Sequence, residues 1–100
     1  MKKIVLLCAG GMSTSLMVTK MKDYADSIGF ECEINAYAVN TAAKNAKDAD
    51  MILLGPQVCF SMDEIKVQCP GVPVEAMDMM DYGMMKGEKV MKHVLEVIGK

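Results

Sequence analysis

Apolar residues lie along this chain in short blocks that alternate with helical patterns. Residues 2–7 end in an unbroken aliphatic run, which is typical of a central strand covered on both faces in a parallel sheet. From Ser13 to Ile28 apolar residues recur every three or four positions, and Gly29 is well placed to end a helix. The pattern therefore predicts a strand, a loop and a helix over residues 2–29.

The same alternation continues to the end of the chain. Residues 31–39 alternate polar and apolar positions, as in a strand near a sheet edge, and Asn40 and Thr41 can cap a short helix that runs to about residue 47. A third strand over 50–54 stops at a Gly-Pro pair, and a weaker helical pattern follows over 60–68. We expect a fourth strand over 73–77 and an amphipathic helix over about 84–98.

Strands that alternate with helices predict right-handed crossovers in an α/β fold. We expect one domain over residues 1–100, a small doubly wound, four-stranded parallel sheet with helices on both faces. In such sheets a ligand crevice lies beyond the carboxyl ends of the strands, where the winding reverses beside the first strand. Cys8 stands at that end, so the first place to look for a site is the segment that follows it.

Composition narrows the possible functions. The chain is 52% hydrophobic, which indicates a globular protein, and eleven lysines against thirteen acidic residues give a net charge of −2, which argues against nucleic-acid binding. No stretch approaches the roughly 18 apolar residues of a membrane span, and the N-terminal apolar run is too short for a signal peptide, so we expect a cytoplasmic protein without membrane insertion. The four cysteines form no CxxC pair and His93 is the only histidine, so we expect no metal site.

The segment after the first strand combines a thiol with the features of an anion cradle. Gly10 and Gly11 allow a tight turn and a close approach of the backbone to a ligand, and the helix that follows begins with backbone N–H groups that lack intrahelical partners. The hydroxyl groups over 13–15 add neutral donors for a phosphate. A helix N-terminus also favours the thiolate form of a cysteine beside it. The pattern predicts a nucleophilic Cys8 in a phosphate-binding loop.

The loop sequence resembles a known family. Residues 8–15, CAGGMSTS, resemble the C-x-x-G-M-S-T-S phosphorylation loop of the enzyme IIB components of the bacterial sugar phosphotransferase system, in the lactose/cellobiose/chitobiose group. Residues 53–57, LLGPQ, are similar to the family's LLGPQ after the third strand. Residues 73–75 with Asp78 and the Tyr82-Gly83 pair are similar to its PVE and YG region. The resemblance thus extends over most of the chain.

The resemblance implies a phosphocarrier without a cofactor. In that family the cysteine accepts a phosphoryl group from a phosphohistidine on a IIA component and passes it to a sugar bound by the membrane component IIC. By this resemblance Cys8 is the carrier residue, Gln57 is a weaker candidate for lining the same crevice, and the sugar is a β-disaccharide such as cellobiose or chitobiose, or lactose. Localisation would be cytoplasmic, at the membrane only through IIC. The phosphate-binding residues would be Ala9, Gly10, Gly11, Met12, Ser13, Thr14 and Ser15.

Two other functions share parts of this pattern. Low-molecular-weight cysteine phosphatases have a C-x₅-R-S loop with the same strand, cysteine, loop and helix, but the arginine position falls on Thr14 here and the chain has no arginine. Without a bidentate guanidinium, the phosphatase reaction loses its main transition-state clamp. A thiol redox or regulatory module would need a resolving cysteine at close spacing, which is missing.

The remaining reactive residues have simpler explanations. Cys32, Cys59 and Cys69 are not followed by a glycine and hydroxyl loop, and we expect them to be buried or half-buried thiols. His93 is expected to be a surface residue or one that neutralises a helix dipole. For the methionines between 77 and 85 the first explanation is that they fill the core. Methionine also suits adaptable binding surfaces, and Met12 in the loop is a candidate for such a contact.

Overall fold

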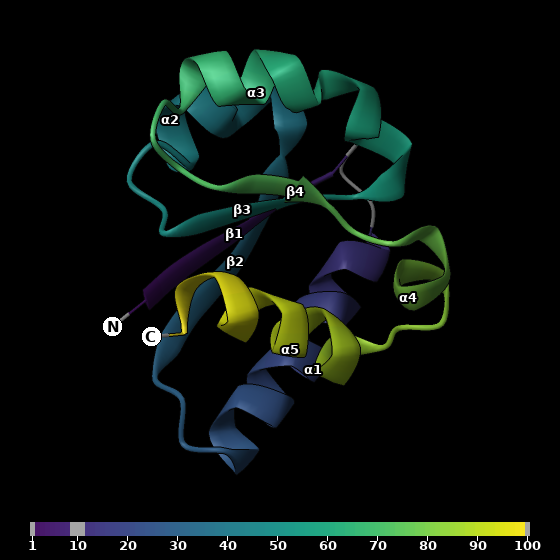
Figure 1. Ribbon diagram of the computed structural model, residues 1–100. Helices are drawn as coiled ribbons and strands as arrows, with labels where there is room; N and C mark the ends of the chain where they lie inside the picture. Colours follow the sequence, from purple (N-terminus) through teal and green to yellow (C-terminus); the bar gives the residue numbers. More distant parts are fainter. Residues whose placement is uncertain (1, 9–11, 100) are drawn as a thin grey trace.

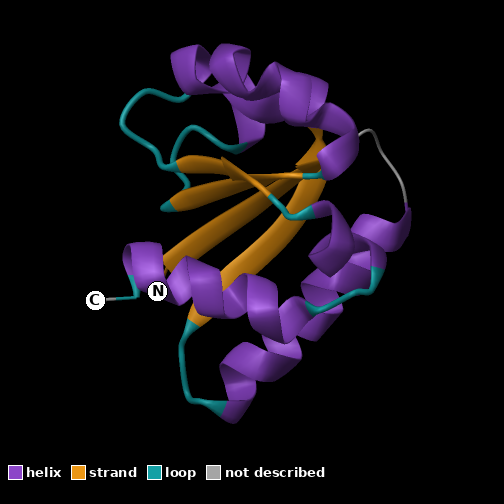
Figure 2. Ribbon diagram, turned by 45° about the vertical axis from the view of Figure 1, so that its right-hand side comes forward, coloured by secondary structure: helices purple, strands orange, loops and turns teal. Residues whose placement is uncertain are grey.

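The computed structural model of the protein describes residues 2–8 and 12–99. Its four strands are all parallel and lie in the order β2-β1-β3-β4. The sheet has helices on both faces (Figures 1 and 2), so the α/β prediction is confirmed. The strands are β1 (Lys2–Cys8), β2 (Cys32–Ala38), β3 (Met51–Leu54) and β4 (Val74–Ala76).

The helices form two layers (Figure 1). On one face lie α1 (Met12–Ser27) and α5 (Gly87–Ile98), and on the other lie α2 (Ala42–Asn45) and α3 (Met62–Gln68). Three shorter elements connect them: the 3₁₀ helices η1 (Val39–Thr41) and η2 (Pro56–Ser61), and α4 (Met79–Gly83), a single helical turn after β4. The sequence pattern did not predict η2 or α4.

Strand β1 explains why its apolar run does not alternate. Ile4, Val5, Leu6 and Leu7 are all completely buried, because β1 lies between β2 and β3 and is covered on both faces. Ile4 and Leu6 belong to the core under α1 and α5, whereas Val5 and Leu7 belong to the core under α2 and α3. Burial of each such side chain contributes roughly 1.5–3 kcal/mol. The strand that carries Cys8 is therefore buried from Ile4 to Cys8, as is the whole of β3.

Several predicted boundaries hold, and others need correction. Gly29 has φ +73°, and the N–H of Phe30 donates to the carbonyl of Ala25 at 2.9 Å, which is a glycine-ended helix as expected. The predicted capping by Thr41 is wrong. Its hydroxyl donates to the carbonyl of Ala38 at 2.7 Å instead of to α2, so α2 begins without a side-chain cap. Asn40, the other predicted cap, lies within η1.

Helices α1 and α5 pack directly on each other at Gly87, the first residue of α5. A Cβ atom at this position would lie 2.5 Å from Cβ of Lys20 and 2.8 Å from the backbone nitrogen of Met21. Because two of the three nearest atoms belong to the α1 backbone, no side-chain rotation can make room. The glycine thus sets how closely the two helices approach.

We expect Gly87→Ala to destabilise the protein. Overpacking a tight contact costs about 1–3 kcal/mol, and each kcal/mol lowers the Tm of a domain of this size by about 4–8 °C. Gly83→Ala is the matched control, because nothing lies within 4 Å of a Cβ there. Thermal unfolding followed by circular dichroism measures both, and a Gly87→Ala variant as stable as the Gly83→Ala variant would contradict the packing described.

Candidate functional site

Cys8 is the last residue of β1, at the carboxyl edge of the sheet. Its backbone pairs in register with Ala38, and its Sγ lies 3.9 Å from the carbonyl oxygen of Tyr37. The residue is only 4% exposed. Since β2 flanks β1 on one side and β3 on the other, Cys8 lies where the winding of the sheet reverses.

Helix α1 begins four residues after Cys8, at Met12. The first backbone N–H groups of a helix have no intrahelical partner, and they carry the positive end of the helix dipole. In this fold that end belongs to the same edge of the sheet as Cys8 (Figure 2). The structure therefore brings a thiol and a source of backbone donors to one edge.

The predicted loop is described only in part. Ala9, Gly10 and Gly11 lie outside the described residues, as do the side chains of Met12, Ser13 and Thr14. Ser15 is exposed in the first turn of α1, and its carbonyl accepts a hydrogen bond from the hydroxyl of Thr19 at 3.2 Å. The role of residues 9–15 in binding phosphate stays a prediction.

The segment after β3 is tied to β1 beside Cys8. The N–H of Gly55 donates to the carbonyl of Leu7 at 2.8 Å, and η2 follows immediately. Gln57 is the second residue of η2, so its backbone belongs to the same edge as Cys8, but its side chain lies outside the described residues. Sequence reasoning placed Gln57 in this crevice, and its contact with a ligand stays a prediction.

Helix α4 follows β4 at the same edge and was not predicted. Asp78 caps it by accepting a hydrogen bond from the N–H of Met80 at 2.7 Å, and Tyr82 anchors it in the core with 7% exposure. The signal for this turn was present in the sequence as an aspartate at the cap position before the apolar pair 79–80. Because these methionines were expected to be buried, the sequence did not lead us to predict a short helix with exposed methionines here.

The methionines of this segment divide between core and surface. Met77 is buried as expected, and Met85 packs partly against the same core. The prediction of a core role is wrong for Met79, Met80 and Met84, which are 75%, 69% and 62% exposed. The physical reason is that a single turn of helix turns one side toward the core, and Tyr82 already occupies it.

The other three cysteines have different environments. Cys69 is buried and Cys32 is half-buried, as predicted, and burial raises the pKa of both thiols. The expectation is wrong for Cys59, which is exposed because its neighbour Val58 takes the buried position in η2. No disulfide joins the four cysteines, all of which are among the described residues.

Thiol labelling distinguishes these environments. We expect Cys59 to react first with a maleimide at neutral pH and Cys69 to react slower by on the order of 10²-fold or more, since it is accessible only when the surrounding core opens. The raised pKa of Cys69 adds to this difference. Peptide mass analysis of a labelling time course gives both rates. Equal rates would show that Cys69 is not buried beside Ala42 of α2 in solution.

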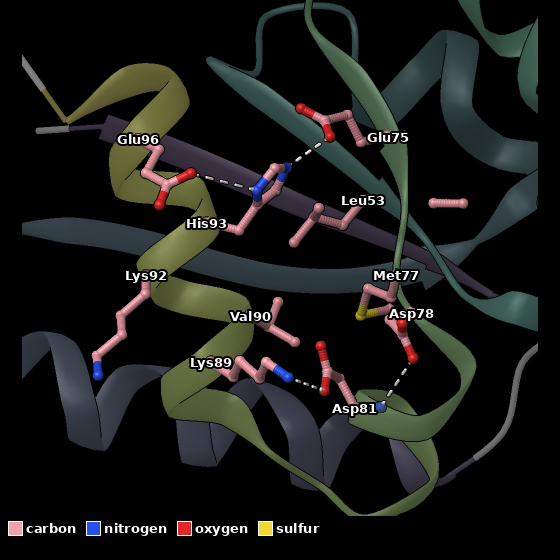
Figure 3. A pocket seen from close by; sticks show the side chains of 11 residues that line it. Leu53, Glu75, Met77, Asp78, Asp81, Lys89, Val90, Lys92, His93 and Glu96 are labelled. Carbon is pink, nitrogen blue, oxygen red and sulfur yellow. Dashed lines mark hydrogen bonds and ion pairs between the residues drawn. The ribbon is translucent and has the colours of Figure 1, made fainter.

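His93 lies in a hollow of about 490 Å³ between α5 and β4 (Figure 3). Its Nε2 is 2.5 Å from Oε1 of Glu75 on β4, and its Nδ1 is 3.8 Å from Oε2 of Glu96. The imidazole is half exposed, so the prediction of a surface residue is confirmed. Glu75, which was singled out only by resemblance, thereby ties the edge strand to α5. Within the described ranges no cluster of metal-binding side chains is found, and no helix there is long and apolar enough to cross a membrane.

Comparison with known proteins agrees with this architecture. Residues 3–93 match the family model described as "PTS system, Lactose/Cellobiose specific IIB subunit". The chain is 46% identical over 100 residues to the oligo-beta-mannoside-specific EIIB component of Bacillus subtilis, with 98% of this chain and 97% of the relative covered. It is 43% identical over 97 residues to the galactose-specific EIIB component of Lactococcus lactis, with 90% of each covered.

Solved structures show the same fold. The lactose-specific IIB domain of Streptococcus pneumoniae superposes with a TM-score of 0.86 at 25% identity, covering 97% of both chains. The cellobiose-specific IIB component of Borrelia burgdorferi gives a TM-score of 0.79 at 33% identity, covering 98% of this chain and 92% of the other. The chain therefore belongs to the lactose/cellobiose-specific IIB family of the bacterial phosphotransferase system, whose members are phosphotransferases that work with IIA and IIC components.

Proposed function

We propose that Cys8 carries the phosphoryl group in this protein. The observation that supports the proposal most directly is the position of Cys8 at the carboxyl end of the central strand, where the winding of the sheet reverses and α1 begins four residues later. This is where α/β sheets bind ligands. Backbone donors at a helix N-terminus suit the oxygens of a phosphoryl group without a metal ion.

The transfer consists of two displacements at phosphorus. In the first, the Cys8 thiolate attacks the phosphohistidine of IIA, an S–P bond forms, the N–P bond breaks, and the imidazole takes up the electron pair of the broken bond. In the second, a sugar hydroxyl bound by IIC attacks the phosphorus and the thiolate leaves. The proton of that hydroxyl passes to a base that we assign to the membrane component. Residues 9–15 would hold the phosphoryl oxygens in both steps.

The sugar we propose is a β-linked disaccharide such as cellobiose or chitobiose, or lactose. The relatives named above are specific for oligo-β-mannosides and galactose, and another from Lactococcus lactis, 43% identical over 97 residues, is specific for cellobiose. Recognition of the sugar would take place in IIC, so this chain would act in the cytoplasm and meet the membrane only through that component.

Reconstitution tests this function. Phosphorylated IIA, this protein and vesicles that contain the cognate IIC should convert one of these sugars to its phosphate, and an oligo-β-mannoside and galactose belong in the panel. Omission of this protein is the control and should stop product formation. Formation of sugar phosphate without this protein would contradict its proposed role. Phosphorylation of Cys8 without conversion of any of these sugars would contradict the proposed sugar class.

The loop proposal predicts that geometry outweighs any single hydroxyl. Gly11→Val should reduce phosphoryl acceptance more than Thr14→Ala, because a β-branched residue restricts the turn, whereas loss of one neutral hydrogen bond costs roughly 0.5–1.5 kcal/mol. Rates of acceptance from phosphorylated IIA compare the two variants. A larger loss from Thr14→Ala would assign the threonine a specific role instead.

A further inference from the structure

Lysine side chains gather around a second hollow, which lies where α1 and α5 pack side by side (Figure 1). Its volume is about 690 Å³, within the roughly 300–1,000 Å³ of small-molecule sites. The described residues around it come from the middle of α1 and from positions 85–92, whereas the proposed phosphate loop after Cys8 is a different segment. We call it the lysine hollow; its charged residues are Lys20, Lys86, Glu88, Lys89 and Lys92.

The close contact at Gly87 brings a lysine of α1 against the start of α5. A Cβ atom at Gly87 would lie 2.5 Å from Cβ of Lys20, so the side chain of Lys20 begins directly beside the first turn of α5. Lys86 precedes that turn, and Lys89 and Lys92 follow at spacings of three residues, which places helical residues next to one another. The two helices thus surround one hollow with positive charge.

Two of these lysines are available to a ligand. Lys89 and Lys92 each lie 3.5 Å from a carboxylate oxygen. Lys20 and Lys86 are both exposed, and the ion pairs found among the described residues include neither of them. The chain as a whole has a net charge of −2, so this concentration of positive charge is local. A local field of this sign attracts anions to the hollow.

The start of α5 adds backbone donors to the same hollow. Lys86 stands at the cap position of this twelve-residue helix, and no side chain caps the helix there. The N–H of Gly87 donates to the carbonyl of Met85 at 2.9 Å. The N–H groups of Glu88 and Lys89 come next in the first turn, where a helix offers them no partner and carries the positive end of its dipole. Ammonium groups and backbone donors therefore belong to one site.

This set of donors suits a phosphate monoester. Such a group carries about −1.5 to −2 charges near neutral pH and has three acceptor oxygens, so it can accept from two lysines and a backbone N–H together. Met85 and the lysine stems provide apolar surface for the carbon part of the ligand. The lysines surround a recess that also contains the carboxylate of Glu88, which fits one small anion better than a broad anionic membrane surface.

We propose that the lysine hollow binds the phosphoryl group of a small phosphate monoester, such as a sugar phosphate. Lys20 and Lys86 hold the phosphoryl oxygens together with the first turn of α5, and the carboxylate of Glu88 weakens the binding. No bond is made or broken in this site, and the inference does not depend on the role of Cys8.

The test titrates the protein with glucose 6-phosphate and follows the backbone amides by NMR, because the residues that shift then identify the site. Glucose is the matched ligand without a phosphoryl group. A Lys20→Gln, Lys86→Gln variant is compared with a Lys44→Gln, Lys66→Gln variant, which makes the same change of net charge at exposed lysines of α2 and α3. A Glu88→Gln variant removes the carboxylate from the hollow.

We expect glucose 6-phosphate, but not glucose, to shift the amides of residues 86–90. The Lys20→Gln, Lys86→Gln variant should bind about tenfold or more weakly, because it loses two charge-assisted hydrogen bonds. The Lys44→Gln, Lys66→Gln variant should stay within about twofold of the wild type, since charges farther than a Debye length are screened. Glu88→Gln should bind about two- to fivefold more tightly, because it removes a repelling charge and frees Lys92.

The variant Glu88→Gln keeps the test decisive, because a loss of fold cannot produce tighter binding. Shifts confined to residues 12–15, or equal losses in the two double lysine variants, would overturn the inference. So would binding to vesicles that contain phosphatidylglycerol, lost in the Lys20→Gln, Lys86→Gln variant, when glucose 6-phosphate shifts no amide of the hollow. That result would assign the lysines to a membrane surface instead.

Discussion

Cys8→Ser is expected to abolish phosphoryl acceptance from phosphorylated IIA, with a loss on the order of 10³-fold or more, as follows from removing a nucleophile. A serine hydroxyl stays protonated near neutral pH, so it is a much weaker nucleophile than a thiolate. The fold should survive, because the change replaces one atom at a strand end, and a hydroxyl can donate to the nearby carbonyl of Tyr37 as the thiol does.

The experiment compares three single variants with the wild type. Intact-protein and peptide mass spectrometry at neutral or mildly basic pH locates the phosphoryl group. Cys59→Ser should accept it normally, which controls for loss of an exposed thiol at the same edge of the sheet. His93→Gln should also accept it. Label retained by Cys8→Ser but lost from His93→Gln would overturn the assignment of Cys8.

The phosphorylated protein is expected to persist in water and to react only with its partners. The chain has no arginine to clamp the phosphoryl oxygens during hydrolysis, and a bidentate guanidinium is the group that cysteine phosphatases use for this purpose. Loss of one such electrostatic contact typically costs 10²–10³-fold in rate. Hydrolysis should therefore be slow on the time scale of transfer.

Decay of the isolated phosphoprotein measures this. It is followed alone, with unphosphorylated IIA, and with vesicles that contain IIC and a sugar. We expect slow decay alone, return of the phosphoryl group to IIA, and sugar phosphate only with the vesicles. Rapid turnover of an aryl phosphate by the protein alone, dependent on Cys8, would instead support a phosphatase.

The layered fold could be predicted because each strand and helix has its own local signal. The unbroken apolar run of β1 indicated a strand covered on both faces, and the polar alternation of residues 31–39 indicated an edge strand, where β2 lies. The stop at Gly29 followed from the left-handed backbone that glycine adopts readily. These features depend on residues that are close in the sequence, so they can be predicted from one sequence alone.

The features that sequence reasoning missed depend on contacts across the fold. Met77 is buried and Met79 is exposed, although both have the same hydrophobicity. The difference arises from how the single turn of α4 packs on the core, which the sequence does not show. Capping by Thr41 failed because the carbonyl of Ala38 competes for its hydroxyl. The pairing of His93 with Glu75 joins a helix to a strand eighteen residues earlier in the sequence, and no local sequence pattern predicts it.

The central place of β1 has a consequence for motion in the native state. Strand β1 is hydrogen-bonded to a neighbour on each side and is buried on both faces, so its amides should exchange with solvent only when the whole domain unfolds. The single turn of α4 follows a three-residue strand at the margin of the sheet, and its amides should exchange through small local openings. The thiol is thus attached to a strand that we expect to open only on global unfolding. The exposed methionines belong to a helical turn that we expect to open at a lower free-energy cost. Local opening of α4 should therefore leave the sulfur atom in place.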